Sequence, residues 1–142
     1  MRFTMETDYA IRIVYCLAKS GKRMDAKTIA ETCGVTLRFS LKILRKLVAA
    51  GIVRSYKGTQ GGYEIARPLD EISLYDVIRT LEGEYHISRC QDEDYNCGRR
   101  EPCKFRKVFC EISKDVQNKL ESYKFSDFKN RSGRKSLPDL SL

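Results

Sequence analysis

Residues 25 to 66 constrain the fold of this chain more than any other segment. Asp25 can cap a short helix, "AKTIAETC", and Gly34 tolerates the positive φ of the tight turn that follows it. Thr36 then caps a longer helix, which Gly51 closes. The residues expected on its buried face are Leu37, Leu41, Leu44, Leu47 and Val48.

Two short extended runs follow, Ile52 to Tyr56 and Tyr63 to Ala66, on either side of a glycine-rich tip. Extended runs around such a tip predict a β-hairpin. A helix, a turn, a second helix and a two-stranded wing, in this order, form a winged helix-turn-helix.

Three more helices are predicted outside this segment. The first covers residues 8 to 19, with Thr7 as its N-cap. Ser73 and Asp76 form a variant capping box in "PLDEISLYDVIRTLEG". From about Lys104 to Tyr123 the apolar residues keep to a narrow stripe, which favours a long helix that packs along a partner. The predicted fold class is mostly α: a winged helix-turn-helix with a two-stranded wing and a long C-terminal dimerisation helix.

The predicted elements divide the chain into four parts. Residues 1–83 form the winged helix-turn-helix domain, 84–103 a cysteine-bearing loop, 104–128 the dimerisation helix and 129–142 a basic flexible tail. The N-terminus has no apolar core of signal-peptide length, and the longest clean apolar run, "IVYCLA", is too short for a membrane span. A cytoplasmic protein with no membrane partner is therefore expected.

The charge pattern favours a polyanionic partner. The net charge is +8, and no acidic residue occurs between Thr32 and Tyr63. An acid-free basic run over a turn, a recognition helix and a wing predicts binding to double-stranded DNA, although generic surface charge on a protein-binding module is the alternative. Arg38 can donate two hydrogen bonds to guanine. The predicted contact residues are Thr36, Arg38, Phe39, Ser40, Lys42, Arg45, Lys57 and Gln60.

Four of the six cysteines follow one another at wide intervals. The intervals between them contain six, five and six residues, which is wider than the ligand pairs of structural zinc sites. Such spacing favours a larger object, an iron–sulfur cluster, because its ligands come from separated points of an irregular loop. Cytoplasmic thiols are kept reduced, which argues against a structural disulfide. These residues are Cys90, Cys97, Cys103 and Cys110.

Other residues near the loop leave the ligand set open. Arg99 and Arg100 favour thiolates, while neighbouring acidic residues oppose them. His86 is the only histidine and is one candidate for a fourth ligand. Cys16 and Cys33 lie outside the loop and are expected in the core.

At this level the chain resembles the IscR/NsrR family of bacterial winged-helix transcription regulators. The resemblance is carried by "MRFTMETDYAIR", by "TIAETCGVTLRFSLKILRKLVAAGIVRSYKGTQGGYEIARP", and by the three-cysteine loop before a long helix. It implies a homodimer whose long helices cross between subunits and whose recognition helices enter the major grooves of a palindromic operator. It also implies that Cys90, Cys97 and Cys103 hold a 2Fe-2S or 4Fe-4S cluster near the dimer interface.

The resemblance also bears on the fourth ligand and on the operator. The assembly regulators have a histidine three residues after the last cysteine, where this chain has Arg106. In the nitric-oxide-sensing branch the ligand is an aspartate of the opposite subunit, and Asp8 matches it, although the helix dipole alone also favours an aspartate there. Asp8 ranks first, Cys110 second and His86 third. Leu41 replaces a glutamate of the assembly regulators, so the operator sequence need not carry over.

The predicted function is transcription regulation, as a repressor. Operator affinity is controlled by a cluster that senses nitric oxide, redox state or iron–sulfur supply. The alternative is a cluster-free repressor that senses oxidants through cysteine thiols. An RNA-binding or ribosome-associated role would share the basic surface. An enzyme with a small-molecule substrate is not expected, because the chain has one histidine, no His/Asp/Ser constellation and no phosphate-cradling glycine motif.

Overall fold

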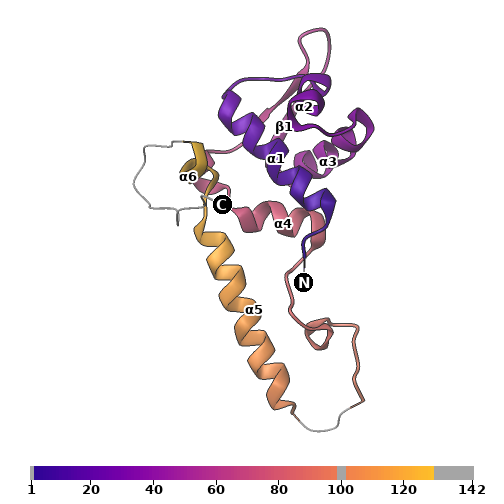
Figure 1. Ribbon diagram of the computed structural model, residues 1–142, viewed down its shortest axis with the longest axis vertical. Coiled ribbons are helices and arrows are strands. Elements are labelled where there is room, and N and C mark those ends of the chain that lie inside the picture. Colours follow the sequence, from indigo (N-terminus) through magenta and orange to yellow (C-terminus); the bar gives the residue numbers. More distant parts are fainter. Residues whose placement is uncertain (1, 99–101, 130–142) are drawn as a thin grey trace.

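The computed structural model describes residues 2–98 and 102–129. Arg99 and Arg100 lie outside the described residues, as does the predicted basic tail beyond Lys129. In Figure 1 one long helix leads away from a helical head, which holds the remaining helices and the wing.

Helix α1, Met5–Ser20, runs through the head, with α2, Ala26–Cys33, and α3, Leu37–Ala49, packed against it. Thr4 caps α1 by accepting a hydrogen bond from the Thr7 N–H, so the prediction of Thr7 as N-cap is wrong. Thr7 is buried in the first turn instead, where its hydroxyl finds a partner on α4.

The predicted caps of the helix-turn-helix are confirmed. The Asp25 carboxylate accepts from the Thr28 N–H at 2.7 Å, and the Thr36 hydroxyl accepts from the Phe39 N–H. Gly34 adopts a φ of 67° in the turn between α2 and α3, a conformation that favours glycine.

The buried face of α3 is rotated relative to the prediction. Leu37 is 46% exposed, and neither Leu41 nor Val48 is fully buried. Apolar residues cover more than one face of this helix, so its packing against α1 and α2 decides which of them become core. The buried residues are Ser40, Ile43, Leu44 and Leu47.

The wing is a two-stranded antiparallel sheet, as predicted. Strands β1, Val53–Tyr56, and β2, Gly62–Ile65, pair from Val53 opposite Ile65 to Tyr56 opposite Gly62. Met24 forms a further antiparallel bridge with Tyr63, which ties β2, near the tip of the wing, to the segment between α1 and α2.

Helix α4, Leu74–Glu82, begins at the predicted capping box, in which Ser73 and Asp76 satisfy each other's backbone N–H groups. It packs against α1 and α3, and its Val77 joins the core. Two short 3₁₀ helices, η1 at Leu69–Glu71 and η2 at Arg89–Gln91, lie in the connections on either side of it.

Helix α5, Lys104–Ser122, is the predicted long helix, but it does not continue to residue 128. Two backbone hydrogen bonds turn the chain after it: Leu74 N–H donates to the Tyr123 oxygen, and Phe125 N–H donates to the Ile72 oxygen. The short helix α6, Phe125–Lys129, then packs on α1 with Phe125 buried.

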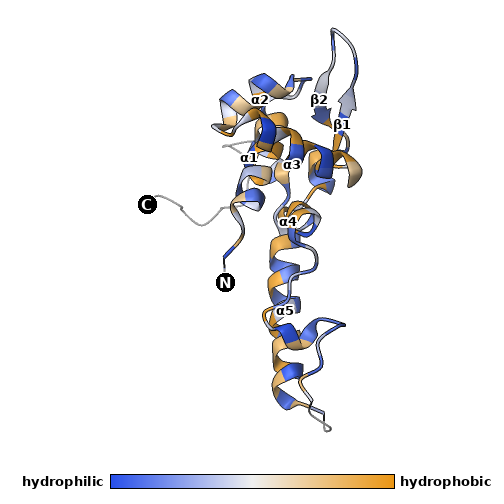
Figure 2. Ribbon diagram, turned by 90° about the vertical axis from the view of Figure 1, so that its right-hand side faces the viewer, coloured by the Kyte–Doolittle hydropathy of each residue, from blue (hydrophilic) through white to orange (hydrophobic). Residues whose placement is uncertain are grey.

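The outer half of α5 presents apolar side chains to solvent. Phe105 is 66% exposed and Val108 is 50% exposed. Apolar stretches of α5 continue away from the head in Figure 2, as expected for a helix that packs along a partner. The mostly α fold class, with its wing and long C-terminal helix, is confirmed. None of the described helices is long and apolar enough to cross a membrane.

Candidate metal centre and nucleic-acid interface

Three cysteines border one open hollow between the cysteine loop and the start of α5. Its volume is about 820 Å³. Cys90 comes from η2, Cys97 from the exposed part of the loop, and Cys103 from the residue directly before α5. The wide spacing of the cysteines therefore brings three separated points of the chain to one shared volume. Other residues around the hollow include Ser88, Tyr95, Phe105, Arg106 and Phe109.

This donor set fits an iron–sulfur cluster in number and chemistry. Three thiols from an irregular segment match the ligands that such clusters use, and the hollow offers them a common space. Within residues 2–98 and 102–129, however, no three side chains of His, Cys, Asp or Glu are gathered closely enough to hold a metal ion. The three thiols share a hollow without forming a closed ligand set.

None of the three predicted fourth ligands is among the described residues that line this hollow. Asp8 is exposed on α1, where its carboxylate pairs with Arg12 at 2.8 Å. Cys110 is exposed on α5. The His86 Nδ1 lies 3.0 Å from an Asp92 carboxylate oxygen. Within one subunit, the described lining of this hollow thus includes Cys90, Cys97 and Cys103 but none of the candidates for a fourth ligand.

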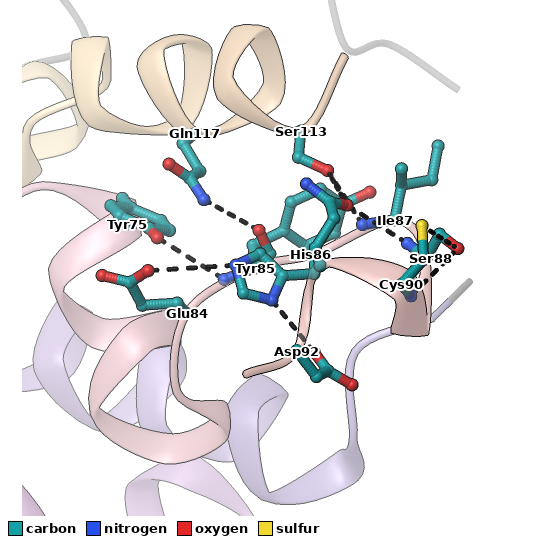
Figure 3. A network of polar contacts seen from close by, with 11 residues as sticks. Tyr75, Glu84, Tyr85, His86, Ile87, Ser88, Cys90, Asp92, Ser113 and Gln117 are labelled. Atoms are coloured by element: carbon teal, nitrogen blue, oxygen red, sulfur yellow. Dashed lines mark hydrogen bonds and ion pairs between the residues drawn. The ribbon is translucent and has the colours of Figure 1, made fainter. Parts of the chain in front are cut away.

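A polar network attaches the loop to α5 (Figure 3). The buried Ser113 hydroxyl accepts from the Ile87 N–H at 2.9 Å and donates to the Gln91 side-chain oxygen at 2.8 Å. Four residues further along α5, Gln117 donates to the Tyr85 carbonyl oxygen at 2.8 Å. These contacts fix the segment that carries Cys90. The sequence offered no signal for Ser113, because its partners are more than twenty residues away.

Ser113→Ala is expected to loosen the loop from α5. It leaves the partly buried Ile87 N–H without its acceptor, a loss of about 1–3 kcal/mol. Exchange of the Ile87 amide hydrogen should accelerate by about 5- to 150-fold in native-state hydrogen-exchange measurements. Ser122→Ala is the matched control, since the Ser122 hydroxyl is exposed and bonds only within α5. Unchanged protection of Ile87 would show that Ser113 does not hold the loop.

A second hollow lies over the N-terminal half of α3, and none of the described residues that line it is a cysteine. It has a volume of about 1040 Å³. Five of the predicted DNA-contacting residues line it together with two leucines: Thr36, Leu37, Arg38, Phe39, Leu41, Lys42 and Arg45. A concave, basic surface at the start of a recognition helix is suited to the major groove.

Ser40 does not belong to this surface. Its side chain is fully buried, so its hydroxyl faces the core rather than a ligand. Phe39 is partly buried, and its ring makes an edge-to-face contact with Tyr9 at 5.7 Å between centroids. Packing thus limits which positions of the first turns of α3 reach the surface.

The predicted wing residues, Lys57 and Gln60, are both exposed at the tip of the hairpin. Arg23, which the sequence did not single out, holds this tip. Its guanidinium stacks on Tyr56 at 3.4 Å from the ring centroid and donates to the Gln60 carbonyl oxygen at 2.9 Å. Arg23 therefore holds the exposed tip of the wing in place.

Glu6 on α1 neutralises two cations of the recognition helix, and sequence reasoning missed it. Its carboxylate lies 2.6 Å from the Lys46 Nζ and 3.3 Å from the Lys42 Nζ. The hydrogen bond from Lys46 lowers the pKa of Glu6 against the effect of desolvation, and Lys42 adds to the lowering. In the absence of DNA, Glu6 therefore holds the side chains of both lysines against α1.

Glu6→Gln is expected to raise the affinity for duplex DNA by about 2- to 10-fold. The substitution frees two lysines from partly exposed ion pairs, each worth about 0–1 kcal/mol, and makes them available to phosphates. Fluorescence anisotropy at several salt concentrations should also show a steeper salt dependence. Glu121→Gln on α5 changes the net charge equally and should have little effect; equal gains from both variants would argue against a specific role of Glu6.

A basic recognition helix, a supported wing and a helix-turn-helix core define a winged helix-turn-helix DNA-binding protein. The model of the Rrf2 family, described as an iron-dependent transcriptional regulator, matches residues 3–131. The chain belongs to the Rrf2 family. Its matching relatives are regulators rather than enzymes, which agrees with the expectation from the sequence.

Two curated relatives illustrate the range of similarity. Protein aau3 of Rhizobium meliloti is 38% identical over 91 residues, which cover 63% of this chain and 59% of aau3. The transcriptional regulator NsrR of Bacillus subtilis is 30% identical over 98 residues, which cover 68% of this chain and 67% of NsrR. The match thus spans between one half and two thirds of the length of these relatives.

Solved structures with this fold extend over most of the chain. IscR of T. potens has a TM-score of 0.72 at 25% identity, covering 90% of this chain and 85% of its own. CymR of B. subtilis, titled a global cysteine regulator, has a TM-score of 0.74 at 25% identity, covering 91% of this chain and 96% of its own. The chain is therefore similar both to an IscR and to a CymR.

Proposed function

We propose that this chain is a transcription repressor that binds a palindromic operator as a homodimer, with Cys90, Cys97 and Cys103 holding an iron–sulfur cluster that sets its operator affinity. The observation that carries this proposal is the single hollow shared by the three thiols. The bound cluster would supply a group that nitric oxide, oxidation or scarcity of iron and sulfide removes or alters. A cytoplasmic location follows from this role.

The exposed stripe on α5 supports the homodimer. Phe105, Val108 and Ile112 are between 39% and 66% exposed on one helix, an apolar surface that pairing with a second copy would cover. A second copy also offers a source for the missing ligand. Asp8 is exposed and outside the hollow of its own subunit, so we assign it to the hollow of the partner.

Direct contacts lead from the hollow toward the recognition helix. The network of Ser113 and Gln117 joins the loop to α5, which packs on α4. At the end of α4, Glu82 accepts hydrogen bonds from the Thr4 N–H at 2.8 Å and the Thr7 hydroxyl at 2.6 Å.

The contact with Glu82 fixes the start of α1 to the end of α4. Burial acts to raise the pKa of Glu82, but the hydrogen bonds from Thr7 and Thr4 outweigh it and leave the pKa lowered. The same first turn of α1 carries Glu6, whose carboxylate forms ion pairs with two lysines of α3. A change at the loop can therefore shift the recognition helix through α5, α4 and α1, provided that these contacts have two arrangements.

Iron and acid-labile sulfide analysis of anaerobically isolated protein tests the proposal. We expect a coloured protein with both elements, and their loss after Cys90→Ser, Cys97→Ser or Cys103→Ser. Cys110→Ser is the matched control, because Cys110 does not line the hollow. Stoichiometric zinc without sulfide would overturn the cluster.

A second candidate is a cluster-free repressor that senses oxidants through the same thiols. It is favoured by the absence, within residues 2–98 and 102–129, of a gathered group of metal-binding side chains. A related structure, S. aureus CymR at 26% identity and a TM-score of 0.70, is titled an oxidised form. Thiol counting before and after peroxide, with operator binding followed in parallel, separates the two candidates.

A further inference from the structure

Three sulfur atoms gather on the head, away from the cysteine loop. Cys16 lies on α1, Cys33 is the last residue of α2, and Met24 lies between these helices, bridged to β2 of the wing. All three border one hollow of about 600 Å³. Both cysteines are partly buried; Cys33 packs against the core, as predicted, whereas Cys16 is not among the described residues that form it.

Two of the three sulfur atoms have the separation that a shared ion needs, and the third lies beside them. Cys16 Sγ lies 3.9 Å from Met24 Sδ, and Cys16 is near enough to Cys33 to add to the effect of burial in raising the pKa of its thiol. Three sulfurs around an ion in a trigonal plane, each about 2.3 Å from it, are about 4 Å apart. The measured separation of Cys16 and Met24 already matches this arrangement.

The thioether is held in place by the wing. The Met24 N–H donates to the Tyr63 oxygen at 2.9 Å, and the Met24 oxygen accepts from the Tyr63 N–H at 2.7 Å. These two bonds fix the Met24 backbone. A thioether combined with thiols is a soft ligand set, which suits Cu(I) and disfavours hard cations such as Mg²⁺.

The surrounding charge is compatible with a monovalent ion between two thiolates. Arg12 and Lys19 border the same hollow. Two thiolates with one monovalent cation carry a net charge of about −1, which these neighbouring cations stabilise, while the preference for Cu(I) rests on the soft sulfur ligands. Burial and the adjacent Cys16 raise the pKa of Cys33 to about 12, so an ion has to displace a proton that is tightly held near neutral pH.

We propose that Cys16, Cys33 and Met24 form a binding site for a soft monovalent metal ion, Cu(I). On binding, both thiols release their protons to solvent, two S–Cu bonds and one thioether–Cu bond form, and no electron is transferred. The ion joins α1, α2 and the segment between them that bridges to β2. Because Cys33 directly precedes the Gly34 turn into α3, the site would stiffen the helix-turn-helix.

A Cu(I) titration of the full-length chain tests this site. The four cysteines of the loop and α5 are first replaced by serine, so that Cys16 and Cys33 are the only thiols left. The reduced protein is then titrated anaerobically against a chromogenic Cu(I) chelator. We expect one Cu(I) per chain, and at least a tenfold loss of affinity after Cys33→Ser or Met24→Leu in the same background.

Met24→Leu keeps an apolar side chain of similar volume and leaves the backbone bridge to Tyr63 intact. Met5→Leu is the matched control, because Met5 is 67% exposed on α1 and does not border the hollow. Failure to hold Cu(I) against the chelator, or an affinity unchanged by Met24→Leu, would overturn the proposal.

X-ray absorption on the loop-serine protein, with its three-sulfur site unsubstituted, gives a reading that does not depend on how the site variants fold. Three sulfur neighbours at about 2.3 Å are expected, similar to a metal–thiolate bond. Two sulfur neighbours, or oxygen and nitrogen neighbours, would contradict a three-sulfur site.

Discussion

Arg38→Ala should weaken operator binding by the proposed dimer at least about 30-fold. Arg38 is exposed on the first turn of α3 and borders the basic hollow of the recognition helix. A bidentate contact of arginine with guanine discriminates by about 1–3 kcal/mol, and a palindromic operator loses it twice. Anisotropy titrations with operator and with random-sequence duplexes measure the effect, and only the operator should show the full loss.

Lys57→Ala distinguishes base recognition from charge. Lys57 is exposed on the wing, where a phosphate contact would weaken binding to all duplexes alike and lower the salt slope by about one. Arg38→Ala should leave that slope almost unchanged. If Arg38→Ala reduced binding equally on operator and random DNA, Arg38 would hold a phosphate rather than a base.

Gly62→Ala should destabilise the head by about 2–4 kcal/mol and detach β2 from Met24. Gly62 has a φ of 147°, and a Cβ added there would lie 2.6 Å from the Met24 carbonyl oxygen. The Met24–Tyr63 bridge fixes the backbone on both sides of this contact. Moving the added Cβ and the Met24 oxygen apart would therefore cost free energy. For a chain of this size, thermal unfolding should begin about 6–15 °C lower.

Gly58→Ala is the matched control within the wing. Gly58 also has a positive φ, of 92°, but a Cβ there would meet no atom within 4 Å. Its cost is therefore backbone strain alone, about 1 kcal/mol, and a smaller shift in melting temperature is expected. Equal shifts for both variants would mean that the close approach to Met24 does not matter.

Features encoded by neighbouring residues could be predicted from the sequence. The caps at Asp25, Thr36 and Ser73 depend on side chains that bond three residues away, and all three are present. The hairpin and the long helix follow from local patterns of the same kind. The spacing favoured a shared role for Cys90, Cys97, Cys103 and Cys110; the first three line one hollow, and Cys110 does not.

Features decided by packing could not be predicted. The face that α3 buries is set by its neighbours, which is why Ser40 is in the core and Leu37 is exposed. The end of α5 is set by backbone hydrogen bonds to the start of α4 and the segment before it, which lie about fifty residues earlier in the chain. Glu6 is separated from Lys46 by forty residues in the sequence, so no local sequence pattern predicts their contact.

The most direct test of the central claim is an anaerobic operator titration of cluster-loaded and iron-free protein side by side. The operator is a duplex that the protein itself selects from random sequences. The account predicts dissociation constants that differ by 5- to 150-fold, a coupling of about 1–3 kcal/mol, and no such difference for the protein with serine at Cys90, Cys97 and Cys103. Equal affinities of the loaded and iron-free wild-type protein would contradict it.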